Sequence, residues 1–260
     1  MKSYRICFIG AGNVATHLAV ELKQLGHEIT QVYSRTEEAA KILARRVNAP
    51  YINSICEITR TADIYFVALK DSVFEKVLEE VELENKLLVH CSGSLPMDIL
   101  SKFSANYGVV YPLQTFSKSR AVNFWEIPIF VEGNSQSNEK LLFDLSKQLS
   151  GLVQVMESHK RKSLHIAAVF ASNFANHCYA LAAQYLESKN ISFEVLRPLI
   201  KETAQKVQEL HPKMAQTGPA IRYDENVINA HLEELNEMPK VRELYNSISK
   251  SIFELHQKKE

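Results

Sequence analysis

The sequence predicts an α/β protein: a Rossmann-like, doubly wound and mainly parallel sheet, followed by a second, all-helical domain. Three observations predict this fold. A glycine-rich turn joins an apolar run to an amphipathic helix near the N-terminus, apolar runs and helical periodicity alternate up to about residue 157, and strand signals stop beyond that point. The expected domains are therefore a Rossmann-like domain over residues 1–157 and a helical domain over residues 158–260.

The glycine-rich turn follows the apolar run 6–9 and reads Gly10-Ala11-Gly12-Asn13-Val14-Ala15. Gly10 permits the tight turn, Gly12 leaves the backbone open to a pyrophosphate, and Ala15 lets the helix lie close to the strand. The helix that begins near Asn13 directs its free N–H groups at the phosphate. We therefore expect a dinucleotide pyrophosphate to be bound by Gly10, Gly12, Asn13 and Val14. The alternative is a structural turn that binds no phosphate.

The end of the second apolar run, residues 29–33, indicates which dinucleotide is bound. It is followed by Ser34, Arg35 and Thr36, where an NAD site usually carries an acidic residue and an NADP site an arginine. A guanidinium suits the 2′-phosphate of NADP, so these three residues are the expected 2′-phosphate site. In the competing interpretation, Arg35 is merely solvated and Thr36 only caps the next helix, a capping role that we expect in either case.

Further apolar runs continue the alternation, at 62–69, 86–90, 108–111, 128–132 and 152–156, with helices predicted at 73–81 and 137–149. Ligands of such sheets lie beyond the carboxyl ends of the strands, so the loops there should share one cleft. Leu69 and Ser92 would then pass near the ribose and the nicotinamide. Cys91 could also approach the nicotinamide, although buried packing suits it better. The segment 111–116 either lines this cleft or forms a rigid turn between domains.

Composition narrows the class of protein. The 260 residues include 30 basic and 30 acidic side chains, so no electrostatic case exists for nucleic acid. No apolar run is long enough to span a membrane, and residues 1–3 lead directly into the first strand without a signal peptide. Four widely spaced cysteines, without a Cys-x-x-Cys pair, are typical of reduced thiols in a cytoplasmic protein: Cys7, Cys56, Cys91 and Cys178.

The longest predicted helix, 159–188, is apolar on most faces and should be buried between domains or between subunits. Polar residues recur along it: His165 and Asn173 belong to a series at steps of four that ends at His177. They could face the cleft, with His165 as general acid and Asn173 orienting a carbonyl or carboxylate, or they could satisfy structural contacts. The spacing of His165 and His177 does not suit a metal site. The basic run 159–162 predicts a solvated helix start.

A Gly-Pro turn in the segment 217–224 precedes another predicted helix. Asp224 is a candidate cap for that helix, and Arg222 could reach an anionic group of a substrate. The sequence leaves the roles of four residues here open: Arg222, Tyr223, Asp224 and His231.

The glycine-rich turn, the Ser34-Arg35-Thr36 segment, the strand at 63–71 and the helical C-terminal half resemble pyrroline-5-carboxylate reductase and the deazaflavin-dependent NADP reductases. More closely, the segments 111–116, 165–173 and 217–231 are similar to an uncharacterised bacterial family of proposed NADP oxidoreductases. That family joins a Rossmann-like domain to a helical domain of unknown function. The resemblance implies the fold, an NADP cofactor and a homodimer formed through the helical domain. It implies no substrate.

One departure concerns the related hydroxyacid dehydrogenases, which use a lysine followed one helical turn later by an asparagine. Here Ile166 stands four residues after Lys162, so that pair is absent, and His165 with Asn173 would replace it. We therefore expect an NADP-dependent oxidoreductase acting on a small carbonyl or imine, with no metal, no nucleic acid and no membrane partner. The alternatives are a non-catalytic NADP sensor acting through a protein partner, and a structural dimer with a vestigial site.

Overall fold

The computed structural model describes residues 2–83 and 85–257, so the outermost ends of the two expected domains lie outside the described residues. The chain divides into two compact units, Met1–Asn173 and Phe174–Glu260. The last strand of the first unit ends at Val155, before the long helix begins at Ser158. The secondary structure thus changes from strands to helices near residue 157, whereas the first compact unit also includes the beginning of that helix.

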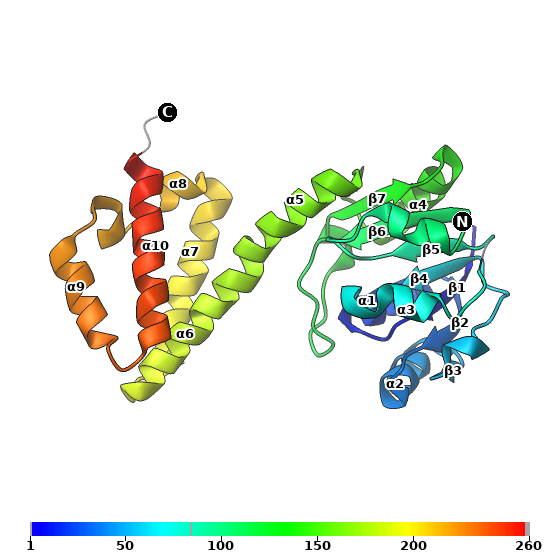
Figure 1. Cartoon of the computed structure of the whole chain (residues 1–260), viewed down its shortest axis with the longest axis horizontal. Coiled ribbons are helices and arrows are strands. Elements are labelled where there is room, and N and C mark those ends of the chain that lie inside the picture. Colours follow the sequence, from blue (N-terminus) through cyan, green and yellow to red (C-terminus); the bar gives the residue numbers. More distant parts are fainter. Residues whose placement is uncertain (1, 84, 258–260) are drawn as a thin grey trace. The chain divides into compact units, whose positions relative to one another are not determined.

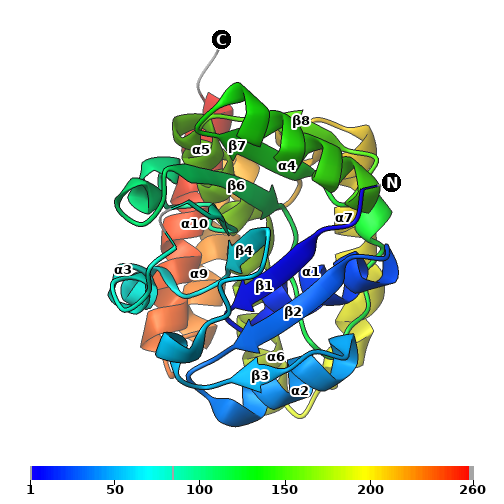
Figure 2. The same cartoon turned by 90° about the vertical axis from the view of Figure 1, so that its right-hand side faces the viewer.

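The first unit contains one eight-stranded sheet with the strand order β3-β2-β1-β4-β5-β6-β7-β8. Neighbouring strands are parallel except for the antiparallel pair β6–β7. The predicted mainly parallel, Rossmann-like sheet is therefore confirmed (Figure 2). The strands are β1 (Arg5–Ile9), β2 (Glu28–Tyr33), β3 (Tyr51–Ile52), β4 (Ile64–Val67), β5 (Leu87–His90), β6 (Asn106–Pro112), β7 (Ile129–Gly133) and β8 (Val153–Val155).

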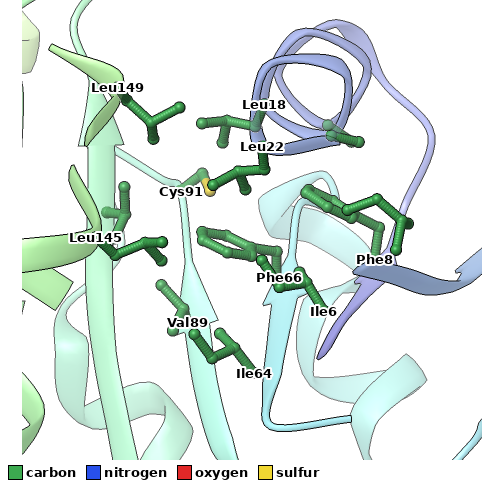
Figure 3. Packing of buried hydrophobic residues seen from close by; sticks show 14 of the residues in the cluster. Ile6, Phe8, Leu18, Leu22, Ile64, Phe66, Val89, Cys91, Leu145 and Leu149 are labelled. Atoms are coloured by element: carbon green, nitrogen blue, oxygen red, sulfur yellow. The ribbon is translucent and has the colours of Figure 1, made fainter. Parts of the chain in front are cut away.

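Helices cover both faces of this sheet because successive strand residues point to opposite sides. Ile6 and Phe8 of β1 pack into one core cluster with α1 (Asn13–Gln24), α2 (Glu37–Val47) and α4 (Gln136–Leu149). Cys7 and Ile9 pack into the other cluster, with α3 (Phe74–Leu78). Figure 3 shows the first cluster, in which Leu18 and Leu22 of α1 lie over Phe66.

Two elements are shorter than the sequence predicts. β4 covers only Ile64–Val67 of the predicted run 62–69. The chain leaves the strand at Ala68, whose carbonyl oxygen would lie 2.3 Å from a Cβ atom added at Gly10. Ala68 and Leu69 therefore belong to the apolar run of the sequence but lie outside the strand. α3 is likewise shorter than its predicted range 73–81: a 3₁₀ turn at Asp71–Val73 precedes it, and the chain turns after Leu78, whose carbonyl accepts the Val81 N–H at 3.2 Å.

The predicted helix 159–188 is present as three consecutive segments: α5 (Ser158–Ala168), the π-helical η5 (Val169–Phe174) and α6 (Ala175–Ser188). The π-helical segment was not predicted. The second unit continues with α7 (Arg197–Glu209), α8 (Pro212–Ala215), α9 (Glu225–Glu234) and α10 (Pro239–Gln257), and α10 contacts α9 (Figure 1). The predicted helical character of the C-terminal region is confirmed for its described residues.

Candidate cofactor cavity and substrate cleft

The glycine-rich turn has the geometry that its sequence predicts. Gly10 has a φ of +120° and donates its N–H to the Tyr33 carbonyl at 2.8 Å, which ties the ends of β1 and β2 together. Both the positive φ and the contact with Ala68 exclude a side chain at Gly10. Gly12 lies at the N-cap of α1, and a Cβ atom there would meet nothing within 4 Å. The N-terminus of α1 therefore opens onto free space, as binding of an anion requires.

A cavity of about 470 Å³ lies beside this turn. It brings together five of the predicted cofactor residues, namely Gly12, Asn13, Val14, Leu69 and Ser92. Lys118 and Phe74, which the sequence did not single out, also line the cavity, as does Asp71 in the loop after β4. Lys118 lies in a loop without strand or helix signals, so only the tertiary structure shows that its ammonium group is near the expected phosphates.

The segment Ser34-Arg35-Thr36 follows β2 at the same sheet edge as Gly10, because Tyr33 pairs with Ile9. Arg35 and Thr36 are exposed, and neither they nor Ser34 line the cavity just described. Thr36 occupies the N-cap position of α2, but its side chain makes no capping hydrogen bond there. The expectation that the Thr36 hydroxyl caps this helix is therefore wrong. The Thr36 carbonyl, which accepts from Ala39 and Ala40, begins the helix instead.

A second cavity of about 620 Å³ lies between the segment that follows β6 and the beginning of the long helix. Both predicted catalytic residues, His165 of α5 and Asn173 of η5, line it. Isolated π-helical turns within α-helices often occur at functional sites, and most of η5 borders this cleft. His177, the last residue of the predicted series, does not line this cleft and belongs to a cavity within the second unit.

His165 is held by two neighbours in the first unit. Its Nδ1 atom lies 3.0 Å from the hydroxyl of Tyr111, at the end of β6. A Cβ atom at Gly93 would lie 2.6 Å from the same nitrogen, so only glycine allows the loop after β5 to approach the imidazole this closely. On this loop, Ser92 lines the cofactor cavity and the next residue, Gly93, contacts His165. The structure thus brings the predicted cofactor residue Ser92 close to the predicted catalytic residue His165.

The segment that lines the substrate cleft is also bound to the glycine-rich turn. The Asn13 side chain donates to the Phe116 carbonyl at 2.8 Å, and His17 Nε2 lies 2.9 Å from the Ser117 carbonyl. The rings of His17 and Phe116 are in contact, with centroids 5.0 Å apart. The predicted pocket-lining role of residues 111–116 agrees with this geometry, and Asn13 serves as the link between the two cavities.

A buried ion pair fixes the beginning of α5. Arg161 is fully buried, pairs with Glu132 of β7 and donates to the Leu95 carbonyl at 2.7 Å. Ser158 completes the cluster, since its hydroxyl donates to Glu132 at 2.8 Å and accepts the Met97 N–H at 2.9 Å. The prediction of a solvated helix start over 159–162 is therefore wrong for Arg161. The basic run 159–162 does not reveal that Arg161 has an acidic partner, Glu132, 29 positions earlier in the chain.

His90 is a further buried polar residue that the sequence did not single out. It is fully buried at the end of β5, and its Nδ1 atom accepts the Ser92 N–H at 3.2 Å. Burial lowers the pKa of His90 to about 3, and the nearby Arg161 guanidinium acts in the same direction, while the Pro96 carbonyl opposes them. The imidazole is therefore neutral near pH 7, and it holds the loop that borders both cavities.

The thiols match the prediction of reduced cysteines, since all four are free. Cys91 is buried, and burial raises the pKa of its thiol to about 12. Cys91 lines the cofactor cavity as well as the core (Figure 3). A protonated, buried thiol is unreactive, so packing is the role that this environment favours.

In the second unit, Asp224 accepts the Val227 N–H at 3.4 Å, which confirms its role as the cap of α9. Tyr223 has a φ of +51°, unusual for a non-glycine residue, and its ring contacts that of Phe253. His231 Nδ1 lies 2.8 Å from the Tyr245 hydroxyl, and Arg222 is exposed. These contacts stabilise the turn and α9.

Over residues 2–83 and 85–257, no group of three or more His, Cys, Asp or Glu side chains is placed to hold a metal ion. Within the same residues, no helix combines the length and the apolar composition needed to cross a membrane.

Two models of known protein families match this chain, one in its N-terminal part and one in its C-terminal part. Residues 5–93 match a family model described as NADP oxidoreductase, coenzyme F420-dependent. Residues 127–252 match a domain of unknown function, DUF2520. A search of curated proteins gave no match.

Solved structures similar to the chain include a “putative NADP oxidoreductase” of Bacteroides fragilis, with 50% identity, a TM-score of 0.94 and coverage of 97% of this chain and 98% of that one. An imine reductase of Myxococcus stipitatus, solved with NADP⁺, is 17% identical with a TM-score of 0.66, covering 97% and 93%. A 1-pyrroline-5-carboxylate reductase of Streptococcus pyogenes is 16% identical with a TM-score of 0.63, covering 97% and 99%. The last two show the fold alone.

Half of the residues are identical to those of the Bacteroides protein over nearly the full length of both chains. The chain therefore belongs to the same family of NADP oxidoreductases, in which a Rossmann-like domain is joined to a DUF2520 domain.

Proposed function

We propose that this protein is an NADP-dependent oxidoreductase that transfers a hydride between the nicotinamide and a small carbonyl or imine. One observation carries the proposal: the loop after β5 borders the cofactor cavity through Ser92 and contacts His165 of the substrate cleft through Gly93. A cofactor in the first cavity would therefore lie close to a substrate and to a group that can supply a proton.

Each cofactor residue has a physical role in this proposal. The backbone N–H groups at the start of α1 would bind the pyrophosphate, with Gly10 shaping the turn and Gly12 leaving it open. Asn13 would contribute its backbone, since its side chain is bonded to Phe116. Leu69 and Ser92 would flank the ribose and nicotinamide, and Lys118 would offset phosphate charge. Ser34, Arg35 and Thr36 would bind the 2′-phosphate.

NADPH, when bound, would supply the hydride, and the chain would supply the proton. In its protonated form, the His165 imidazole would give one proton to the substrate oxygen or nitrogen as the carbon accepts the hydride, and the ring would be left neutral. The products are then NADP⁺ and an alcohol or amine. The Asn173 amide would orient the substrate, since it lines the same cleft.

The proposal is tested by NADPH oxidation against a panel of small ketones, aldehydes and cyclic imines. The wild type should turn over at least one of them, and His165→Ala should lower kcat by about 100-fold, within the range of general acid catalysis. The matched control is His177→Ala on α6, outside the cleft, which should retain activity. Equal turnover by wild type and His165→Ala would exclude the acid role. NADPH binding without turnover of any substrate would favour a sensor instead.

The choice of NADP over NAD is tested by cofactor titration. Arg35→Ala should weaken NADPH binding about 10- to 100-fold, because a charge-assisted contact contributes roughly 1.5–3 kcal/mol, and NADH binding should change little. Arg46→Ala, an exposed arginine elsewhere on α2, controls for the loss of charge. Equal weakening of NADPH and NADH by Arg35→Ala would contradict a 2′-phosphate contact.

We also propose that the helical unit forms a homodimer. The supporting observation is an apolar stripe along α7 and the residues after it, in which Leu199 and Met214 are 62% and 75% exposed in the single chain. Val207 and Leu210 extend the same stripe, at 42% and 47%. Exposed apolar side chains gathered along one segment are typical of an interaction surface, and a second copy of the chain would supply a matching one.

Dimer formation is tested by light scattering coupled to size exclusion. The wild type should have the mass of two chains, and Leu199→Glu should reduce it to one. Ile42→Glu, which alters an exposed apolar residue of the first unit, should leave the mass unchanged. A monomeric wild type at high concentration would overturn the proposal.

A further inference from the structure

The pair formed by Tyr111 and His165 goes one step beyond the proposed function, on which the following inference rests. Tyr111 lies on β6 and pairs in register with Phe130 of β7, so the sheet holds its ring. Its hydroxyl lies 3.0 Å from His165 Nδ1, and the two rings meet edge-on with centroids 6.0 Å apart. Tyr111 is only 8% exposed. The phenol is thus a fixed partner for one nitrogen of the imidazole.

The backbone of His165 is fixed as well. Arg161, one helical turn earlier on α5, is bound to Glu132 and to the Leu95 carbonyl. The Gly93 backbone covers the Cβ, Cγ and Nδ1 side of the imidazole, where an added Cβ would lie within 2.9 Å of each of these atoms. These contacts engage the Nδ1 side of the ring and leave Nε2 as the nitrogen available to a ligand in the cleft.

The hydrogen bond with Tyr111 also determines where the imidazole proton resides. A phenol O–H is a stronger donor than the N–H of a neutral imidazole, and the unprotonated ring nitrogen is a good acceptor. The O–H of Tyr111 should therefore donate to Nδ1, which places the proton of the neutral ring on Nε2. When the ring is protonated, Nδ1–H donates to the phenol oxygen and Nε2 still carries a proton.

We propose that Tyr111 is a positioning residue: its hydrogen bond to Nδ1 of His165 fixes the ring so that Nε2 is the nitrogen that gives a proton to the substrate. After the transfer, the phenol oxygen accepts the Nδ1–H that the neutral ring keeps. Without the hydroxyl, the neutral ring would distribute its proton between both nitrogens and would lose the contact that sets its orientation. Burial raises the pKa of Tyr111, although the Arg161 guanidinium opposes that shift, so the phenol keeps its proton at neutral pH. Tyr111 supports the proton transfer through its hydrogen bond with His165.

The first test measures the tautomer of His165 directly and does not depend on finding a substrate. Nitrogen-15 NMR of histidine-labelled protein, with the His165 signals assigned by their loss in His165→Gln, should show the neutral ring with its proton on Nε2. In Tyr111→Phe, which keeps the aromatic ring, the Nδ1 signal should lose the shift caused by an accepted hydrogen bond. A wild-type ring protonated on Nδ1, or a spectrum unchanged in Tyr111→Phe, would overturn the proposal.

The second test uses turnover of whichever small carbonyl or imine proves to be a substrate. Tyr111→Phe should lower kcat by about 10-fold or more with little change in KM, because proton transfer depends on the orientation of the imidazole and ground-state binding does not. Tyr107→Phe, at the other end of β6 with its hydroxyl near Asp98, is the matched control and should retain full activity. If no substrate is turned over, the proposed reductase function fails, and the NMR experiment still decides the role of Tyr111.

Discussion

The two units of this molecule bury very different amounts of apolar surface. In the first unit, both faces of the sheet are packed against helices, and residues such as Ile6, Leu18 and Phe66 are completely buried. Among the described residues of the second unit, the buried apolar side chains are Ala220, Ile228 and Leu235. Because burial of apolar surface is the main source of folding free energy, the first unit has its own core. The second unit leaves large apolar side chains such as Leu199 and Met214 exposed in the single chain.

The predicted functional residues are also divided unequally between the two units. The predicted cofactor and catalytic residues all belong to the first unit, including His165 and Asn173 on the part of the long helix that is packed with the sheet domain. The second unit contributes an exposed apolar stripe and a capped helical turn. Rigid positioning of reactive groups requires a packed scaffold, which the first unit provides.

The largest expected effect is the loss of the buried ion pair in the first unit. Arg161→Met should lower the free energy of unfolding by about 3–5 kcal/mol, since it leaves the Glu132 carboxylate without its buried partner. Urea denaturation of the purified protein measures this change. Lys160→Met, its exposed neighbour, should alter stability by less than about 0.5 kcal/mol. Similar values for the two variants would mean that the pair does not anchor α5.

A matched pair of leucines compares the two cores directly. Leu18→Ala in the first unit should cost about 2–5 kcal/mol, because Leu18 is fully buried. Leu199→Ala in the second unit should cost less than about 0.5 kcal/mol for the monomer, because Leu199 is 62% exposed. In a dimer this second cost should grow with protein concentration. Equal costs for the two leucines at every concentration would remove the distinction between the units.

The stability of the first unit should fall as the pH falls from 7 to 5. The folded-state pKa of His90 is lowered to about 3, first by burial, so the unfolded chain binds a proton near pH 6.5 that the folded chain does not bind. The contribution of neutral His90 to the free energy of unfolding is therefore fully present above about pH 6.5. At pH 5 the free energy of unfolding should be about 2 kcal/mol lower. His27, whose pKa burial also lowers, adds to the loss.

Urea denaturation at pH 7 and pH 5 measures this dependence. His90→Gln should reduce the difference between the two pH values by most of that amount, whatever its effect on absolute stability. An unchanged difference in His90→Gln would show that other groups account for the pH dependence.

The smallest expected effect compares two helix caps. Asp224→Ala removes the side chain that caps α9 in the second unit, and Ser135→Ala removes the one that caps α4 in the first, where it accepts the Asn138 N–H at 3.2 Å. Each should cost about 1 kcal/mol. Thermal unfolding followed by circular dichroism would detect both. A negligible loss for Asp224→Ala alone would indicate that α9 is frayed in solution.

Local sequence patterns predicted those features of this protein that depend on nearby residues. The glycine-rich turn, the alternation of strands and helices, the helical C-terminal region and the cap at Asp224 each arise from interactions over a few positions, so their patterns are visible in the chain. The choice of His165 and Asn173 was also possible, because polar residues on an apolar helix stand out. Their placement in one cleft came from the fold.

Only the tertiary structure could identify the contacts between distant segments. Arg161 was expected to be solvated, because nothing near it in the sequence reveals Glu132 on β7. Tyr111 and Gly93 meet His165 from two different strand ends, and His90 holds the loop that joins the two cavities. Periodicity specifies which face of an element is apolar. Which side chains meet across the sheet edge is decided by the packing of elements far apart in sequence, and the proposed chemistry depends on that packing.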